Sequence, residues 1–192
     1  MSSYVKADTL MGAALAPLDS VRSAGLAIVF SLFIAACAQF AIHIGPIPIT
    51  GQTFAVLLTG ALLGSRLGAM AVIAYLIEGA IGLPFFAAGG AGLVRFFGPT
   101  GGYLVAFPAA AFITGAFAEY GWDKRYLTAV AAMVIGSVVI FLGGWAWFAV
   151  LTNTPPVAAF KIAVAPFLLG DVIKIVLGAA VLPTGWALLK KK

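Results

Sequence analysis

The stretch SAGLAIVFSLFIAACAQFAI, residues 23–42, contains no charged side chain. An α-helix of this length is about 30 Å long, which is the thickness of the hydrocarbon core of a bilayer. The rest of the chain has the same character: 63% of its 192 residues are hydrophobic, 9% are charged, and the mean hydropathy is +1.13. A soluble domain carries roughly 25% charged residues. The sequence therefore predicts an all-α, multi-pass protein of the cell membrane, embedded in lipid as one membrane domain over residues 1–192.

Cys37 raises one alternative, because Ile34-Ala-Ala-Cys37 resembles the cleavage box of a lipoprotein signal. The region before it is long and contains Asp8 and Asp19, unlike a short basic leader. More apolar sequence follows Cys37 rather than a polar mature domain. We therefore expect residues 23–42 to remain as a permanent helix.

Several functions are disfavoured by the residues that the chain lacks. The net charge of +5 comes from scattered or terminal basic residues, so no nucleic-acid surface is expected. No P-loop, dinucleotide-binding or nucleophile-elbow motif occurs, so an ATPase that drives this protein would be a separate polypeptide. His43 is the single histidine and has no Cys or acidic neighbour, so we expect no metal ion and no cofactor.

The apolar sequence divides into six segments, residues 23–42, 53–64, 67–81, 101–117, 126–151 and 159–189. Six crossings put both termini on one side of the membrane. Most basic residues then fall on that side, and only Arg95 and Lys161 lie outside. The positive-inside rule makes this side the cytoplasm, with residues 1–22 as a cytoplasmic N-terminal segment. The Pro/Gly-rich loops 43–52 and 84–100 then face the outside.

Asp171 and Lys174 lie within the sixth segment, in LLGDVIK, residues 168–174. A charge inside a membrane helix costs roughly 2.5–3.5 kcal/mol, so it usually marks a functional site. Three residues apart, the two side chains share one helical face, within reach of each other or of a common ligand. The alternative is an internal salt bridge with a purely structural role. We favour a polar ligand site at membrane depth.

Both outer loops contain further candidates. Gln52 can donate and accept hydrogen bonds at once, and its apolar loop is either a connector or a lid over the site. The second outer loop is rich in glycine and carries Arg95, which is either an interfacial anchor or a ligand contact. The small residues Ala27, Ser31 and Ala35 share a face of the first helix, which packs internally or docks a partner subunit.

Four motifs together resemble the BioY family, the biotin-binding S components of energy-coupling factor (ECF) transporters. They are PIPITGQT (residues 46–53), EGAIGLP (78–84), GPTGGYL (98–104) and PFLLGDVIK (166–174). The resemblance implies a six-helix S-component bundle that binds biotin near the outer surface and catalyses no reaction. It also implies association with a transmembrane coupling subunit and a pair of cytoplasmic ATPases. Whether the chain forms a homo-oligomer is not predicted, and an S component for another small vitamin is the alternative function.

The resemblance and, independently, the chemical groups of biotin predict a set of ligand-binding residues. Asp171 accepts hydrogen bonds from the ureido N–H groups of biotin, and Lys174 donates to the ureido oxygen or to the carboxylate. Arg95 is the alternative partner of the carboxylate. The apolar ring is covered by aromatic side chains, and the loops supply polar contacts; these residues are Phe85, Phe86, Tyr103, Thr50, Gln52 and Gly90. Some family members have Asn where this chain has Gly90 or Ala91, so the second loop departs from the family pattern. A membrane enzyme, the alternative from another class, would need a second acid near Asp171, and Glu78 is the one candidate.

Overall fold

The computed structural model describes residues 9–15, 19–43 and 45–189. In these residues the chain is mostly helical. The α-helices are α1 (Leu10–Leu15), α2 (Ser20–Gln39), α3 (Gln52–Leu63), α4 (Ser65–Ala80), α5 (Gly101–Glu119), α6 (Tyr126–Thr152), α7 (Pro156–Ala163) and α8 (Leu168–Leu189). Short 3-10 turns are η1 (Ala87–Gly89), η2 (Leu93–Phe96), η3 (Trp122–Lys124) and η4 (Ala165–Phe167). The strands β1 (Ala41–Ile42) and β2 (Ile49–Thr50) form a small antiparallel hairpin, called the hairpin below.

In the described part of the chain, four helical stretches are long and apolar enough to cross a membrane. They are Ser20–Gln39, Gly101–Glu119, Tyr126–Thr152 and Pro156–Leu189. The other two expected segments form α3 and α4, which have 12 and 16 residues. The prediction of an integral membrane protein with several apolar helices is therefore confirmed.

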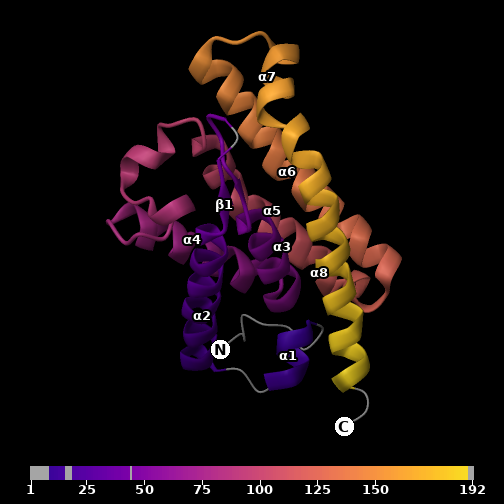
Figure 1. Ribbon diagram of the computed structural model, residues 1–192. Helices are drawn as coiled ribbons and strands as arrows, with labels where there is room; N and C mark the ends of the chain where they lie inside the picture. The colour runs from indigo at the N-terminus through magenta and orange to yellow at the C-terminus, as the bar shows by residue number, and fades with distance from the viewer. Residues whose placement is uncertain (1–8, 16–18, 44, 190–192) are drawn as a thin grey trace.

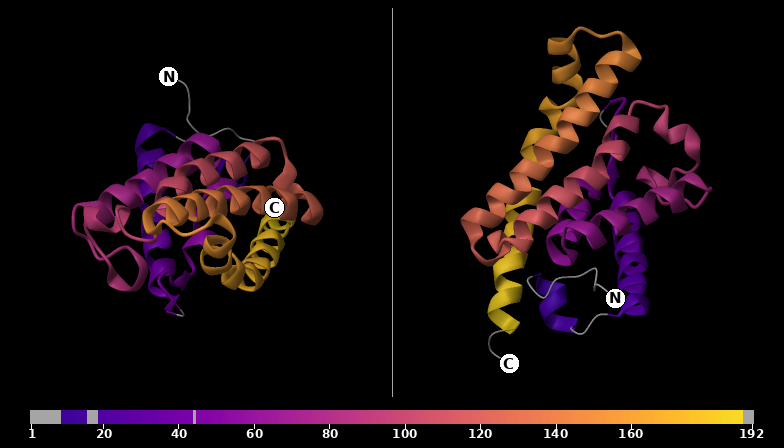
Figure 2. Two further views of the ribbon diagram at one scale, coloured as in Figure 1. Left: turned by 90° about the horizontal axis from the view of Figure 1, so that it is seen from above. Right: turned by 180° about the vertical axis from the view of Figure 1, so that it is seen from behind.

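The helices form one bundle in which α5 lies between α6 on one side and α3 and α4 on the other. Helix α2 packs on α4, and α8 packs on α6 and α3. The hairpin and α7 lie at the end of the bundle opposite α1 and the last turn of α8 (Figures 1 and 2). The site described below lies at the hairpin end.

Small residues allow the closest helix contacts. A Cβ atom at Gly60 would overlap the backbone of Ala111 on α5, and one at Gly68 would lie 2.8 Å from the Cα atom of Gly60. These contacts agree with the packing that small residues permit between membrane helices. Ala27 and Ser31 on α2 are also buried, so this face packs inside the chain.

The turn between α3 and α4 consists of Gly64 alone, whose φ of +86° is accessible to glycine at little cost. The new helix is capped by Glu119 from α5, whose Oε1 accepts hydrogen bonds from the backbone N–H and the hydroxyl of Ser65, both at 2.8 Å. This cap satisfies one of the free N–H groups at the start of α4. It also ties the α3–α4 turn to the end of α5.

Two local predictions need correction. Residues 159–189 do not form one continuous helix, because α7 ends at Ala163 and η4 precedes α8. Pro166 lies in this break, and proline lacks the N–H group that would continue the helix. The first apolar segment does not stay helical to Ile42, because α2 ends at Gln39 and Ala41–Ile42 form β1. Helix α2 begins at Ser20 because Asp19 caps it: the Asp19 carboxylate accepts a hydrogen bond from the backbone N–H of Arg22 at 2.7 Å. Residues 1–8 and 16–18 of the expected N-terminal segment lie outside the described residues.

Candidate functional site

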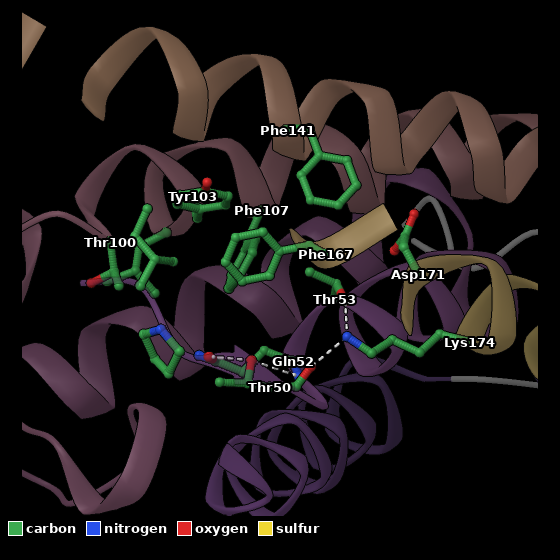
Figure 3. A pocket seen from close by; sticks show the side chains of 13 residues that line it. Thr50, Gln52, Thr53, Thr100, Tyr103, Phe107, Phe141, Phe167, Asp171 and Lys174 are labelled. Atoms are coloured by element: carbon green, nitrogen blue, oxygen red, sulfur yellow. Dashed lines mark hydrogen bonds between the residues drawn. The ribbon is translucent and has the colours of Figure 1, made fainter. Parts of the chain in front are cut away.

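A cavity of about 50 Å³ lies between the hairpin, α5, α6 and α8, and is called the inner cavity below (Figure 3). Its walls combine a few polar groups with apolar and aromatic side chains, which is the usual composition of a small-molecule site. The lining residues are Ile47, Pro48, Thr50, Gln52, Thr53, Thr100, Tyr103, Leu104, Phe107, Phe141, Phe167, Asp171 and Lys174.

Asp171 lies in the first turn of α8 and is 6% exposed. The helix dipole favours a negative charge at this position. The hydroxyl of Ser137, a buried residue on α6, donates a hydrogen bond to Asp171 Oδ2. The carboxylate is therefore held at the cavity wall by a neutral donor.

Lys174 is half-buried and reaches in a different direction, toward the hairpin and the start of α3. Its Nζ donates to the carbonyl oxygen of Thr50 at 2.6 Å and to Thr53 Oγ1 at 3.1 Å. Among the described residues, no ion pair joins Lys174 to Asp171, and the two side chains diverge in Figure 3. The internal salt bridge that the sequence left open is thus not formed.

Gln52 belongs to a chain of hydrogen bonds that joins the hairpin to α4 and the second outer loop. Its Oε1 accepts from the Thr50 hydroxyl at 2.9 Å, and its Nε2 donates to the Tyr75 hydroxyl at 2.5 Å. The Tyr75 hydroxyl donates in turn to the carbonyl oxygen of Phe85 at 3.2 Å. These bonds fix the orientation of the Gln52 amide beside the cavity.

Aromatic side chains form the apolar wall. The Phe167 ring centroid lies 6.5 Å from that of Tyr103 and 6.4 Å from that of Phe141. The Tyr103 hydroxyl donates to the carbonyl oxygen of Ala163, the last residue of α7. The break before α8 is therefore tied to α5, and this tie places Phe167 against the cavity.

A second and larger cavity, of about 490 Å³, adjoins the first and is called the outer cavity below. The two cavities share Pro48, Gln52, Thr100 and Leu104 as lining residues. The remaining lining residues of the outer cavity come from the hairpin region and the second outer loop, and they are His43, Pro46, Phe86, Ala87, Ala91, Val94, Arg95, Gly98 and Pro99. The outer cavity thus continues from the inner one toward the hairpin end of the bundle.

Arg95 is exposed, and its side chain lies over Gly90, where a Cβ atom would come within 2.8 Å of Arg95 Nε. Phe86 is 2% exposed and makes edge contacts with Tyr75 and Phe96, both at 5.7 Å between ring centroids. It touches the outer cavity only. Phe85 and Gly90 line neither cavity.

The structure thus brings Thr50, Gln52, Tyr103, Asp171 and Lys174 together in the inner cavity and puts Arg95 and Phe86 at the outer one. Four residues at the inner cavity were not predicted from the sequence: Phe107, Phe141, Phe167 and the supporting Ser137. Helical spacing could have predicted two of these positions. Phe107 lies four residues from Tyr103 and Phe141 lies four from Ser137, so each pair shares one helical face. Glu78 lines neither cavity, and the described residues contain no cluster of three or more His, Cys, Asp or Glu side chains that could hold a metal ion.

Comparison with known proteins identifies the family. The model of the BioY family matches residues 7–191. The chain belongs to the BioY family. One BioY relative, named probable biotin transporter BioY, from Pyrococcus horikoshii, is 43% identical over 138 residues, which cover 71% of this chain and 79% of the relative. Another, the biotin transporter BioY of Rhizobium etli, is 39% identical over 141 residues, covering 70% of this chain and 75% of the relative.

A solved structure extends the comparison to the fold. The crystal structure at 2.1 Å of the S-component for biotin from an ECF-type ABC transporter superposes with a TM-score of 0.79 and 26% sequence identity. The match covers 90% of this chain and 92% of that chain. The fold is therefore that of an ECF S component, and the BioY relatives are transporters rather than enzymes.

Proposed function

We propose that this protein binds biotin as the S component of an ECF-type uptake transporter in the cell membrane. The observation that carries the proposal is the presentation of Asp171 and Lys174 into one cavity without an ion pair between them in the described residues. Biotin carries both N–H donors and oxygen acceptors, so it can use both charges at once. The relatives named as biotin transporters support this ligand.

The ureido ring occupies the inner cavity, where its N–H groups donate to Asp171. Asp171 is the one carboxylate that lines either cavity, and a charged acceptor makes the stronger hydrogen bond. Lys174 donates to an oxygen of the ligand. The aromatic wall of Tyr103 and Phe167 covers the thioether ring, while the carboxylate tail passes toward Arg95.

Binding requires the site to enlarge. Ligand pockets have volumes of roughly 300–1,000 Å³, and the inner cavity has about 50 Å³. The hairpin is the element that moves, because it contributes the cavity wall at Thr50 and Ile47 and is held to α8 through a side chain. It acts as a lid over the site.

The membrane arrangement follows from the charges. The helical passes α2, α3, α4, α5, α6 and α7–α8 cross the membrane as six spans of one domain, residues 1–192. Arg66, Lys124 and Arg125 lie at turns that then face the cytoplasm, as do both termini. A transmembrane coupling subunit and a pair of cytoplasmic ATPases complete the transporter.

Equilibrium binding of radiolabelled biotin to the full chain in detergent tests the proposal. Asp171→Asn and Lys174→Met each remove a charge-assisted hydrogen bond of about 1.5–3 kcal/mol, which weakens binding by roughly 10- to 150-fold. Two variants serve as matched controls. Asp123→Asn changes a buried carboxylate in η3, and Lys161→Met removes an exposed cation on α7. Neither residue lines the inner or the outer cavity, so both variants should bind biotin normally.

Lipoate completes the experiment, because it has the same pentanoate tail as biotin and no ureido ring. It should compete poorly. Biotin binding that Asp171→Asn and Lys174→Met leave unchanged would reject the site. Absence of biotin binding to the wild-type chain would reject the function, and equal binding of lipoate would show that the ureido ring is not what is recognised.

A further inference from the structure

The outer cavity has about 490 Å³, against about 50 Å³ for the inner cavity. Its volume alone is in the range of sites for drug-sized ligands. The four residues that the cavities share include Thr100, which lies across the inner cavity from Asp171 in Figure 3. A ligand whose head group is bound at Asp171 therefore directs its tail past Thr100 and into the outer cavity.

The ionisable side chains that line the outer cavity are all basic. Arg95 is the permanent cation among its lining residues, His43 is the other basic side chain, and none of the lining residues is acidic. Arg95 and Val94 are both exposed, so this cavity opens at the surface of the bundle. Such a space suits a tail that is neutral or anionic and that continues beyond the length of pentanoate.

We propose that the chain binds biotin derivatives extended at the carboxyl end, namely amides whose added atoms occupy the outer cavity. The inference rests on the proposed binding of biotin and specifies how far recognition extends along the ligand. The inner cavity selects the head group, because both Asp171 and Lys174 line it and its aromatic wall is close. The outer cavity tolerates the tail, because it is larger than the inner cavity and supplies Arg95 as its one permanent charge.

The test uses three ligands on the purified full chain: biotin, N-biotinyl-6-aminohexanoate and the methyl ester of that amide. We expect both extended ligands to bind within about tenfold of biotin. Arg95→Gln should weaken the extended acid by about tenfold or more and leave the ester unchanged, since only the acid carries a charge for the guanidinium. Lys161→Gln is the matched control, an exposed outer cation that lines neither cavity, and it should leave all three affinities unchanged.

Ala91→Phe provides a second variant that needs no charge. Ala91 lines the outer cavity alone, so the added ring should weaken both extended ligands at least tenfold more than it weakens biotin. If biotin binds but both extended ligands bind more than about 1,000-fold more weakly than biotin, this inference is overturned and the proposed function stays intact. Equal effects of Ala91→Phe on all three ligands would overturn it as well. Failure of biotin itself to bind would reject both.

Discussion

Substitution of Lys174 by Met should loosen the hairpin in the empty protein. Lys174 on α8 donates from Nζ to the Thr50 carbonyl at 2.6 Å and to Thr53 at 3.1 Å, and Thr50 belongs to β2. The hairpin itself has only two residue pairs, Ala41 with Thr50 and Ile42 with Ile49. A contact from a distant helix therefore supplies a large part of its stability.

The magnitude follows from the kind of bond that is lost. A hydrogen bond from a charged group contributes about 1.5–3 kcal/mol net of solvation. Met retains the apolar stem and removes the donor, so packing changes little. The free energy of opening the hairpin should fall by the same amount, which raises its opening equilibrium by roughly 10- to 150-fold.

Amide hydrogen exchange measured by mass spectrometry reports this equilibrium directly. When closing is fast, the exchange rate is proportional to the opening constant, so peptides that cover β1 and β2 should exchange faster by that factor. Peptides from α5 and α6 should be unaffected. Lys161→Met, on exposed α7, is the control that removes a lysine without touching the hairpin. Exchange of the hairpin within about twofold of wild type would show that Lys174 does not hold it closed.

Two further predictions concern stability. Burial raises the pKa of Asp123, although the hydrogen bond from Trp186 and the charge of Lys124 act to lower it. The protonated side chain therefore contributes its full stability below pH 3.8, the ordinary pKa of Asp, and this contribution is lost as the pH rises through the folded pKa. Asp123→Asn should therefore raise the melting temperature at pH 7, by roughly 2–4 °C for each kcal/mol of stability gained, and should change it little near pH 4. An equal rise at pH 7 and pH 4 would show that the burial of the charged carboxylate is not the reason. Tyr103→Phe leaves the Ala163 carbonyl without its donor and should destabilise the protein by about 1–3 kcal/mol in a thermal melt, and an unchanged melting temperature would show that this bond is dispensable.

Much of the site could be predicted because charge and backbone-breaking residues are rare in a membrane helix. Asp171 and Lys174 stand out against an apolar background, and both line the inner cavity. Pro and Gly in residues 43–52 marked the break after the first helix, which contains β2 and the turn of the hairpin. Tyr103 and Gln52 were found through the family resemblance, and Gln52 also through its polarity; both line the same cavity.

The aromatic wall could not be predicted in the same way. In a soluble helix the apolar residues mark the buried face, but in lipid both faces are apolar, so Phe141 and Phe112 look alike in sequence. Phe141 is 9% exposed and lines the cavity, whereas Phe112 is 47% exposed on the outside of the bundle. Ser137 was missed for a related reason, since a single serine is inexpensive in a membrane helix and gives no signal until its partner is known.

The separate partners of Asp171 and Lys174 bear directly on binding. Had they formed a buried ion pair, a ligand would have to break it, and removing one partner of such a pair costs about 3–5 kcal/mol. Here Asp171 accepts from the Ser137 hydroxyl, and Lys174 donates to the Thr50 carbonyl and the Thr53 hydroxyl. Each charge is thus stabilised by a neutral group. A ligand that offers N–H donors to one and an oxygen to the other exchanges neutral hydrogen bonds for its own, and it does so without separating opposite charges inside the membrane.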